Sequence, residues 1–121
     1  ILDLKGKHTR SELLANWSEE LKNITFLTGK SEEIIKNLEL NRINFAFLDG
    51  AHNFKVLKKE FDYVKIRQKI GDIIVFDDVT DSEFDEIVNF ISNIKNHDHY
   101  DVNFLKSEKQ RGYAIAVKNE N

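Results

Sequence analysis

The chain has 121 residues, of which 40% are hydrophobic and 32% are charged, and its formal net charge is −3 at pH 7. This composition predicts one folded domain with a hydrophobic core and excludes a disordered segment. The net charge provides no basic surface for nucleic acid. No apolar run reaches the roughly 18 residues that cross a bilayer. The lack of cysteine excludes disulfides and thiolate metal sites.

The first part of the chain predicts an alternation of short strands and helices. Ile1–Leu4 is an apolar piece typical of the end of a strand. A capping box at Thr9–Glu12 and the apolar residues that follow at helical spacing predict a helix, with Trp17 on its core-facing side. Residues 24–28 are β-branched and aromatic, which favours a strand, and Ser31 is placed to cap the next helix.

The second part contains two continuous apolar runs, residues 44–48 and 73–76, which predict strands buried on both faces. Apolar residues at three- and four-residue steps predict a helix over 53–68 between them, and another helix after a second capping box at Thr80. The last two strands, 100–105 and 112–117, have no helix between them and must therefore be antiparallel neighbours.

The order of these elements, β-α-β-α-β-α-β-α-β-β, predicts an α/β fold. We expect a Rossmann-like, mostly parallel sheet with helices on both faces and a C-terminal antiparallel hairpin. We expect a single domain over residues 1–121. Because the chain lacks methionine and opens within an apparent strand, we also expect a trimmed fragment. A cytoplasmic location is the default expectation, since no signal-like start is present.

Acidic residues follow both apolar runs. Asp49 ends the first run, and Asp77 and Asp78 end the second. In a parallel sheet these strand ends meet at the edge where ligands bind. Three carboxylates there would repel one another unless they bound protons or a hard divalent cation such as Mg²⁺. The structural alternative is that Asp49 belongs to an Asp-Gly turn and that Asp77 or Asp78 caps the next helix.

His52 lies three residues beyond Asp49, where a helix is expected to begin. A lone histidine is more often structural or simply exposed. Beside a metal and substrate crevice it becomes a candidate general base, because its unperturbed pKa is about 6.5.

These residues resemble motifs of the class I S-adenosylmethionine (SAM)-dependent methyltransferases, and most closely those of the metal-dependent O-methyltransferase branch. The two motifs are Phe-Ala-Phe-Leu-Asp-Gly-Ala-His over residues 45–52 and Gly-Asp-Ile-Ile-Val-Phe-Asp-Asp-Val over residues 71–79. The resemblance extends from Ile1 to about Val117 and matches the second to the seventh strand of that fold. It implies transfer of a methyl group from SAM to a hydroxyl of a small molecule or sugar.

The resemblance also implies a metal site and a base. Asp49, Asp77 and Asp78 would hold Mg²⁺ or a similar divalent cation, with Asp49 also at the cofactor. His52 matches the histidine that serves as general base in some members of the family.

Two further residues match positions at the cofactor. Asp3 would bind the ribose hydroxyls of SAM, and Ser31 would line the adenine. The family's first strand and glycine-rich loop are missing from the sequence. We therefore expect this chain to bind SAM weakly or not at all. Three arrangements stay open for the second and fourth strands of the family's fold: they pair directly, accept a strand from another chain, or leave exposed edges through which copies of the chain associate. The other expected partner is a small-molecule substrate, with neither nucleic acid nor membrane.

Two other classes of protein stay open. A receiver-like signalling domain has a similar size and binds Mg²⁺ through clustered aspartates, but its paired acids follow the first strand, whereas Asp77 and Asp78 follow the fourth. A non-catalytic methyltransferase-like remnant or assembly module would keep the fold without the cofactor pocket, and the missing glycine-rich loop favours it.

Overall fold

The computed structural model divides into two compact units, Ile1–Lys30 and Ser31–Asn121. The structure describes residues 10–49, 53–77, 79, 85–106 and 112–121. The strand expected at residues 1–4 and the capping residues Thr9 and Thr80 lie outside this described part. That residues 1–121 form a single domain stays a prediction.

The first unit contains two short helices in place of the one that was predicted. α1 (Arg10–Asn16) and α2 (Ser18–Leu21) are separated by Trp17, whose backbone angles of φ −130° and ψ 44° are not helical. The Trp17 side chain is 43% exposed, so its prediction as a core residue is wrong. The strand predicted over residues 24–28 is also wrong, since these residues form no strand. A β-branched run becomes a strand only beside a hydrogen-bonded neighbour, and β propensity does not supply one.

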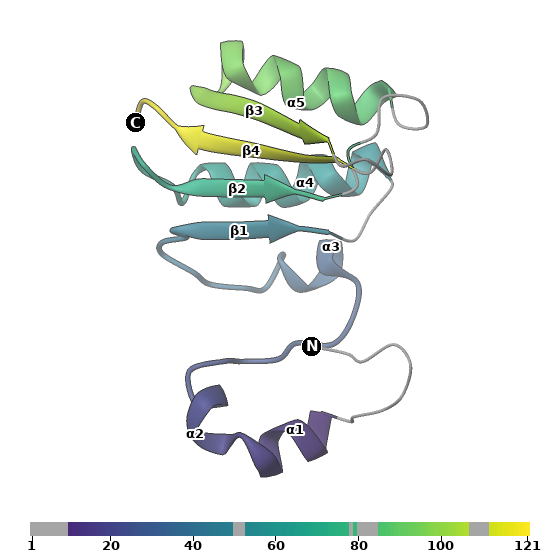
Figure 1. Ribbon diagram of the computed structural model, residues 1–121, viewed down its shortest axis with the longest axis vertical. Helices are drawn as coiled ribbons and strands as arrows, with labels where there is room; N and C mark the ends of the chain where they lie inside the picture. The colour runs from purple at the N-terminus through teal and green to yellow at the C-terminus, as the bar shows by residue number, and fades with distance from the viewer. Residues whose placement is uncertain (1–9, 50–52, 78, 80–84, 107–111) are drawn as a thin grey trace. The chain divides into compact units, whose positions relative to one another are not determined.

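The second unit is built on a four-stranded sheet in the order β1-β2-β4-β3 (Figure 1). Its strands are β1 (Phe45–Leu48), β2 (Ile73–Phe76), β3 (Tyr100–Lys106) and β4 (Gly112–Lys118). β1 and β2 are parallel, as predicted, and the β3–β4 hairpin is antiparallel, as predicted. A mostly parallel sheet is wrong for the described strands, because β4 enters the sheet beside β2 and pairs with it in the antiparallel direction.

Three described helices belong to this unit: α3 (Ser31–Ile34), α4 (Phe54–Lys65) and α5 (Asp85–His97). α3 begins at Ser31, but this helix is only four residues long. α4 begins where predicted, because the Asn53 side chain accepts a hydrogen bond from the Lys55 backbone N–H at 2.9 Å and so caps the helix. None of the helices in the described part is long and apolar enough to cross a membrane.

α4 and α5 pack on the same face of the sheet, and the hydrophobic core of this unit lies between these helices and the sheet. Phe61 of α4 is 1% exposed, and its ring centroid lies 5.3 Å from that of Phe90, 5.7 Å from that of Tyr100 and 6.4 Å from that of Phe76. Aromatic residues from both helices and from two strands therefore meet at one point. The buried core consists of Leu57, Phe61, Val64, Ile74, Phe76, Val79, Ile87, Ile91, Ile94, Tyr100, Ala114 and Ala116.

The second face of the sheet is apolar as well. Side chains alternate between the faces of a sheet, so Phe45 and Phe47 lie opposite the core face, in register with Ile73 and Val75. The exposed fractions of Phe45 and Phe47 are 59% and 51%. Helices on both faces are thus not confirmed for the described part of this unit.

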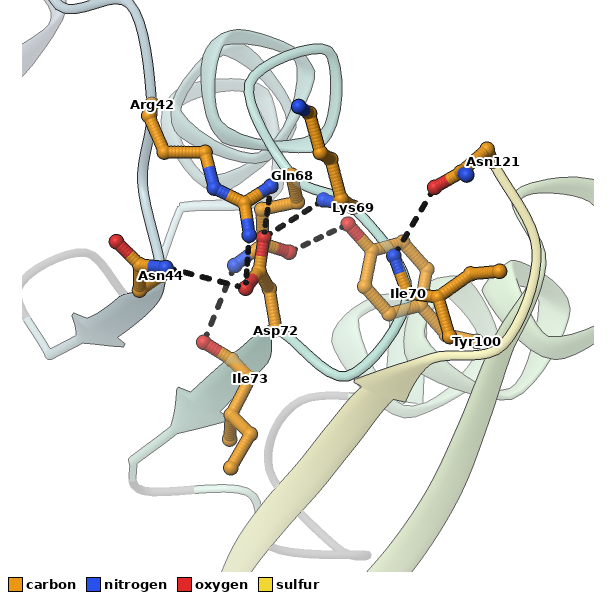
Figure 2. Close-up of polar contacts among 9 residues, drawn as sticks. All are labelled: Arg42, Asn44, Gln68, Lys69, Ile70, Asp72, Ile73, Tyr100 and Asn121. Atoms are coloured by element: carbon orange, nitrogen blue, oxygen red, sulfur yellow. Dashed lines mark hydrogen bonds and ion pairs between the residues drawn. The ribbon is translucent and has the colours of Figure 1, made fainter.

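A buried carboxylate joins the starts of β1 and β2 (Figure 2). Asp72 is 6% exposed and accepts hydrogen bonds from the two terminal guanidinium nitrogens of Arg42, at 2.8 and 2.9 Å. The Lys69 backbone N–H donates to it at 2.6 Å, and the Asn44 side-chain amide donates at 3.5 Å. The burial of this charge is therefore compensated by an ion pair and by further donors.

A second polar group, beside Asp72, links the core to the start of β2 (Figure 2). The buried Gln68 side chain donates to the Ile73 carbonyl at 3.2 Å and accepts from the Tyr100 hydroxyl at 2.7 Å. Burial raises the pKa of Tyr100, and the carboxylates of Asp98 and Asp72 raise it further. The hydroxyl consequently stays protonated and remains a donor to Gln68 at neutral pH.

Candidate functional site

The ends of two neighbouring parallel strands bring Asp49 and Asp77 to one edge of the sheet. Leu48 and Phe76 are the last paired residues of β1 and β2. The Asp77 backbone N–H donates to the Leu48 carbonyl at 3.1 Å. Asp49 and Asp77 are therefore equivalent positions on adjacent strands, which lie roughly 4.8 Å apart in a sheet. The structure therefore brings the backbones at Asp49 and Asp77 close together, as inferred from the two apolar runs. The role of the two carboxylates stays a prediction.

The segment after Asp77 is fixed against the start of β4. Val79 is 4% exposed, and its backbone N–H donates to the Gly112 carbonyl at 2.9 Å. A Cβ atom on Gly112 would lie 2.5 Å from the Val79 carbonyl oxygen and 3.1 Å from that of Leu105. Only glycine allows this approach, so Gly112 helps to position the segment that includes Asp77. Sequence reasoning missed this role, although a glycine at the start of a strand can indicate a close backbone approach.

We expect the substitution Gly112→Ala to lower the free energy of unfolding by about 1–3 kcal/mol, because the new methyl group must displace the Val79 carbonyl or the start of β4. Urea denaturation followed by circular dichroism measures this change. The control is Asn103→Ala, an exposed position on the neighbouring strand β3, for which we expect a change within about 0.5 kcal/mol. Equal stability of the Gly112→Ala protein and the wild type would contradict the packing role of Gly112.

The other predicted site residues are placed differently or lie outside the described part. Asp3, His52 and Asp78 are outside it, so their roles stay predictions. The Ser31 hydroxyl donates to the Glu60 carboxylate, in the middle of α4. Among the residues that the structure describes, no group of three or more histidine or acidic side chains is arranged to hold a metal ion.

A cleft of about 690 Å³ lies beside the C-terminal part of α4. The Arg67 guanidinium stacks on the Tyr63 ring at 3.5 Å from its centroid, and its Nε donates to the Leu40 carbonyl at 2.7 Å. Asp49 precedes the other end of α4, and a helix of this length spans about 18 Å. The cleft is therefore separate from the strand ends. It is lined by Ile35, Lys36, Leu38, Glu39, Leu40, Asn41, Asp62, Tyr63, Ile66 and Arg67.

Comparisons with known proteins identify relatives by structure alone. No protein-family model matches the chain, and no curated protein sequence matches it. A candidate O-methyltransferase from Klebsiella pneumoniae superposes with a TM-score of 0.70 at 17% identity, covering 91% of this chain and 55% of that one. A candidate methyltransferase from Streptococcus mutans, solved in complex with SAH, gives a TM-score of 0.59 at 18% identity, covering 91% of this chain and 72% of that one. The O-methyltransferase from Bacillus cereus, also solved with SAH, gives a TM-score of 0.53 at 17% identity, covering 73% of this chain and 46% of that one.

The chain thus has a methyltransferase-like α/β fold with a four-stranded mixed sheet. It spans about half the length of the Klebsiella pneumoniae protein that it matches. The resemblance stated from the sequence is confirmed at the level of the fold. Identities of 17–18% do not extend that confirmation to an activity, a substrate or the metal-dependent branch.

Proposed function

We propose that this chain is part of a SAM-dependent methyltransferase that methylates a hydroxyl of a small molecule or sugar with the help of a divalent cation. The observation that carries the proposal is the pairing of Leu48 with Phe76, which puts Asp49 and Asp77 at equivalent positions on adjacent strand ends. The similar structures solved with SAH support the choice of cofactor, since SAH is what remains of SAM after the methyl group has left.

The proposed metal site consists of Asp49, Asp77 and Asp78. Carboxylate oxygens are the ligands that Mg²⁺ prefers, so the two carboxylates at the paired strand ends fit such an ion. When bound, the ion would lower the pKa of the substrate hydroxyl and orient it. His52 would accept the hydroxyl proton as the methyl carbon passes from sulfur to oxygen.

Two residues are proposed to hold the cofactor. Asp3 would accept hydrogen bonds from the ribose hydroxyls of SAM. Ser31 would line the adenine, and its hydroxyl would then exchange its hydrogen bond to Glu60 for a contact with the cofactor.

Saturation-transfer NMR with SAM and SAH tests the proposal, because the method detects weak ligands. Transfer of a labelled methyl group to a panel of catechol and sugar hydroxyls, with Mg²⁺ and then with EDTA, tests the reaction. We expect saturable SAM binding and transfer that stops when EDTA removes the cation. Transfer that persists in EDTA would contradict the metal site, and the lack of any signal from SAM or SAH would favour the non-catalytic alternative.

A second candidate function is a non-catalytic assembly module. The observation that favours it is the position of β1 at the edge of the described sheet, with exposed phenylalanine side chains. Edge strands of this kind are ready to pair with another chain. On this alternative the chain would associate with a partner strand and give no saturation-transfer signal from SAM.

A further inference from the structure

The C-terminal half of α4 holds the segment of residues 31–43, which leads from the start of α3 towards β1. Glu60 and Tyr63 lie on the same side of α4, and Arg67 follows one turn later, just beyond the end of the helix. The side chains of all three form hydrogen bonds with this segment. The segment is therefore attached to α4 at several points along its length.

The Tyr63 hydroxyl is the centre of these contacts. It donates a hydrogen bond to the Leu38 carbonyl and accepts one from the Leu40 N–H at 3.2 Å, since a phenol can donate and accept at the same time. The Arg67 guanidinium stacks on the Tyr63 ring, and its Nε donates to the Leu40 carbonyl at 2.7 Å. Tyr63 and Arg67 together thus bind both backbone groups of Leu40.

Backbone hydrogen bonds connect Leu38 to Ser31. The Ile35 N–H donates to the Ser31 carbonyl at 2.9 Å, and the Leu38 N–H donates to the Ile35 carbonyl at 3.4 Å. A shift of Leu38 is therefore transmitted through these turns to Ser31. Near Ser31 itself, Glu32 pairs with Lys59 at 3.2 Å, but a partly exposed ion pair of this kind contributes little to stability.

We propose that Tyr63 is a positioning residue for the cofactor, because its hydroxyl holds residues 31–40 against α4 and so keeps Ser31 where it lines the adenine of SAM. This inference rests on the proposed function, which assigns Ser31 to the adenine. When Ser31 gives up its hydrogen bond to Glu60 for the cofactor, the contacts of Tyr63 and Arg67 remain and keep the segment in place.

The proposal separates the cofactor from the cation. Tyr63 acts through Ser31 and does not touch SAM itself, so its hydroxyl affects the affinity for SAM. The proposed cation ligands follow β1 and β2, which are paired with each other through their own backbone hydrogen bonds. Loss of the Tyr63 hydroxyl should therefore leave the affinity for a divalent cation unchanged.

The first measurement is hydrogen exchange at the Leu40 amide, followed residue by residue by NMR. Tyr63→Phe removes the hydroxyl that accepts from this amide and keeps the ring on which Arg67 stacks, so we expect the Leu40 amide to exchange roughly tenfold faster or more. The matched control is Tyr113→Phe, which removes a phenol hydroxyl from a side chain that is 43% exposed on β4. It should leave exchange at Leu40 unchanged.

The second measurement compares the affinities for SAM and for Mn²⁺. With Tyr63→Phe we expect the dissociation constant for SAM, from saturation-transfer titration, to rise roughly threefold or more, while the affinity for Mn²⁺ stays at the wild-type value. A general loss of folded protein would weaken the binding of both ligands. Arg67→Lys keeps the positive charge but loses the Nε donor and the planar stack, so it should act in the same direction as Tyr63→Phe.

The two measurements distinguish the possible failures. Unchanged exchange at Leu40 in Tyr63→Phe would show that the hydroxyl does not hold the segment and would overturn the proposal. Faster exchange with an unchanged affinity for SAM would overturn the positioning role while the cofactor assignment stands. A wild-type chain that gives no signal from SAM would overturn the cofactor assignment of Ser31 and the positioning role together.

Discussion

Replacing Asp49 and Asp77 together by asparagine is expected to abolish divalent cation binding and to slow metal-dependent methyl transfer about a thousandfold, equivalent to about 4 kcal/mol of transition-state stabilisation. Asparagine keeps the shape of the side chain but removes the negative charge that holds the ion. The two residues occupy equivalent positions after β1 and β2, so their loss would leave Asp78 as the only carboxylate of the proposed site. Titration with Mn²⁺ followed by electron paramagnetic resonance measures the binding directly.

The matched control for this experiment is Asp101→Asn. Asp101 is exposed on β3 and accepts a hydrogen bond from the Asn119 side chain at 2.9 Å, so this variant removes one carboxylate that the proposed site does not use. We expect its Mn²⁺ affinity to equal that of the wild type. The metal proposal fails if the Asp49 and Asp77 double variant is folded and still binds Mn²⁺ as tightly as the wild type does.

Replacing Phe61 by alanine is expected to lower the free energy of unfolding by about 3–5 kcal/mol. Phe61 is 1% exposed, and its ring contacts aromatic residues of α5, β2 and β3. A cavity at this point removes contacts between both helices and the sheet at once. The measurement is urea denaturation at constant pH, with intrinsic fluorescence and circular dichroism as two probes.

Phe104→Ala provides the comparison for Phe61. Phe104 is also a phenylalanine, on β3, but its side chain is 41% exposed. Since much of this ring is already in water, we expect its loss to cost about 1 kcal/mol or less. If the two variants lose the same stability, the aromatic cluster around Phe61 is not the centre of the core.

The two apolar runs were the most predictable part of the fold, although the predicted burial of both faces is wrong for β1, where Phe45 and Phe47 are exposed. Residues 44–48 and 73–76 are uninterrupted and β-rich, and the structure places β1 and β2 there as a parallel pair. The helix between them followed from its apolar spacing, and the structure adds that Asn53 caps it. These features depend on neighbours within a few residues, and local patterns record such neighbours well.

The features that the sequence did not predict depend on residues far apart in the chain. β4 lies between β2 and β3, and its strand pattern does not specify which strand it will pair with on its second side. Residues 24–28 carry a strand pattern but form no strand. In the candidate site, Asp49 and Asp77 were predictable as strand ends. The contact between Gly112 and Val79 was not, because it joins the start of β4 to a segment that is distant in sequence.

The buried Asp72 has a consequence for residues at the other end of the sheet. It lies immediately before β2, and it binds Arg42 and Asn44 immediately before β1. A shift of either strand by one residue would move its end by about 3.3 Å and turn its side chains to the opposite face. Such a shift would break the contacts of Asp72 first. Asp72 therefore helps to keep Asp49 and Asp77 aligned at the ends of β1 and β2, one strand length away, through the register of the two strands.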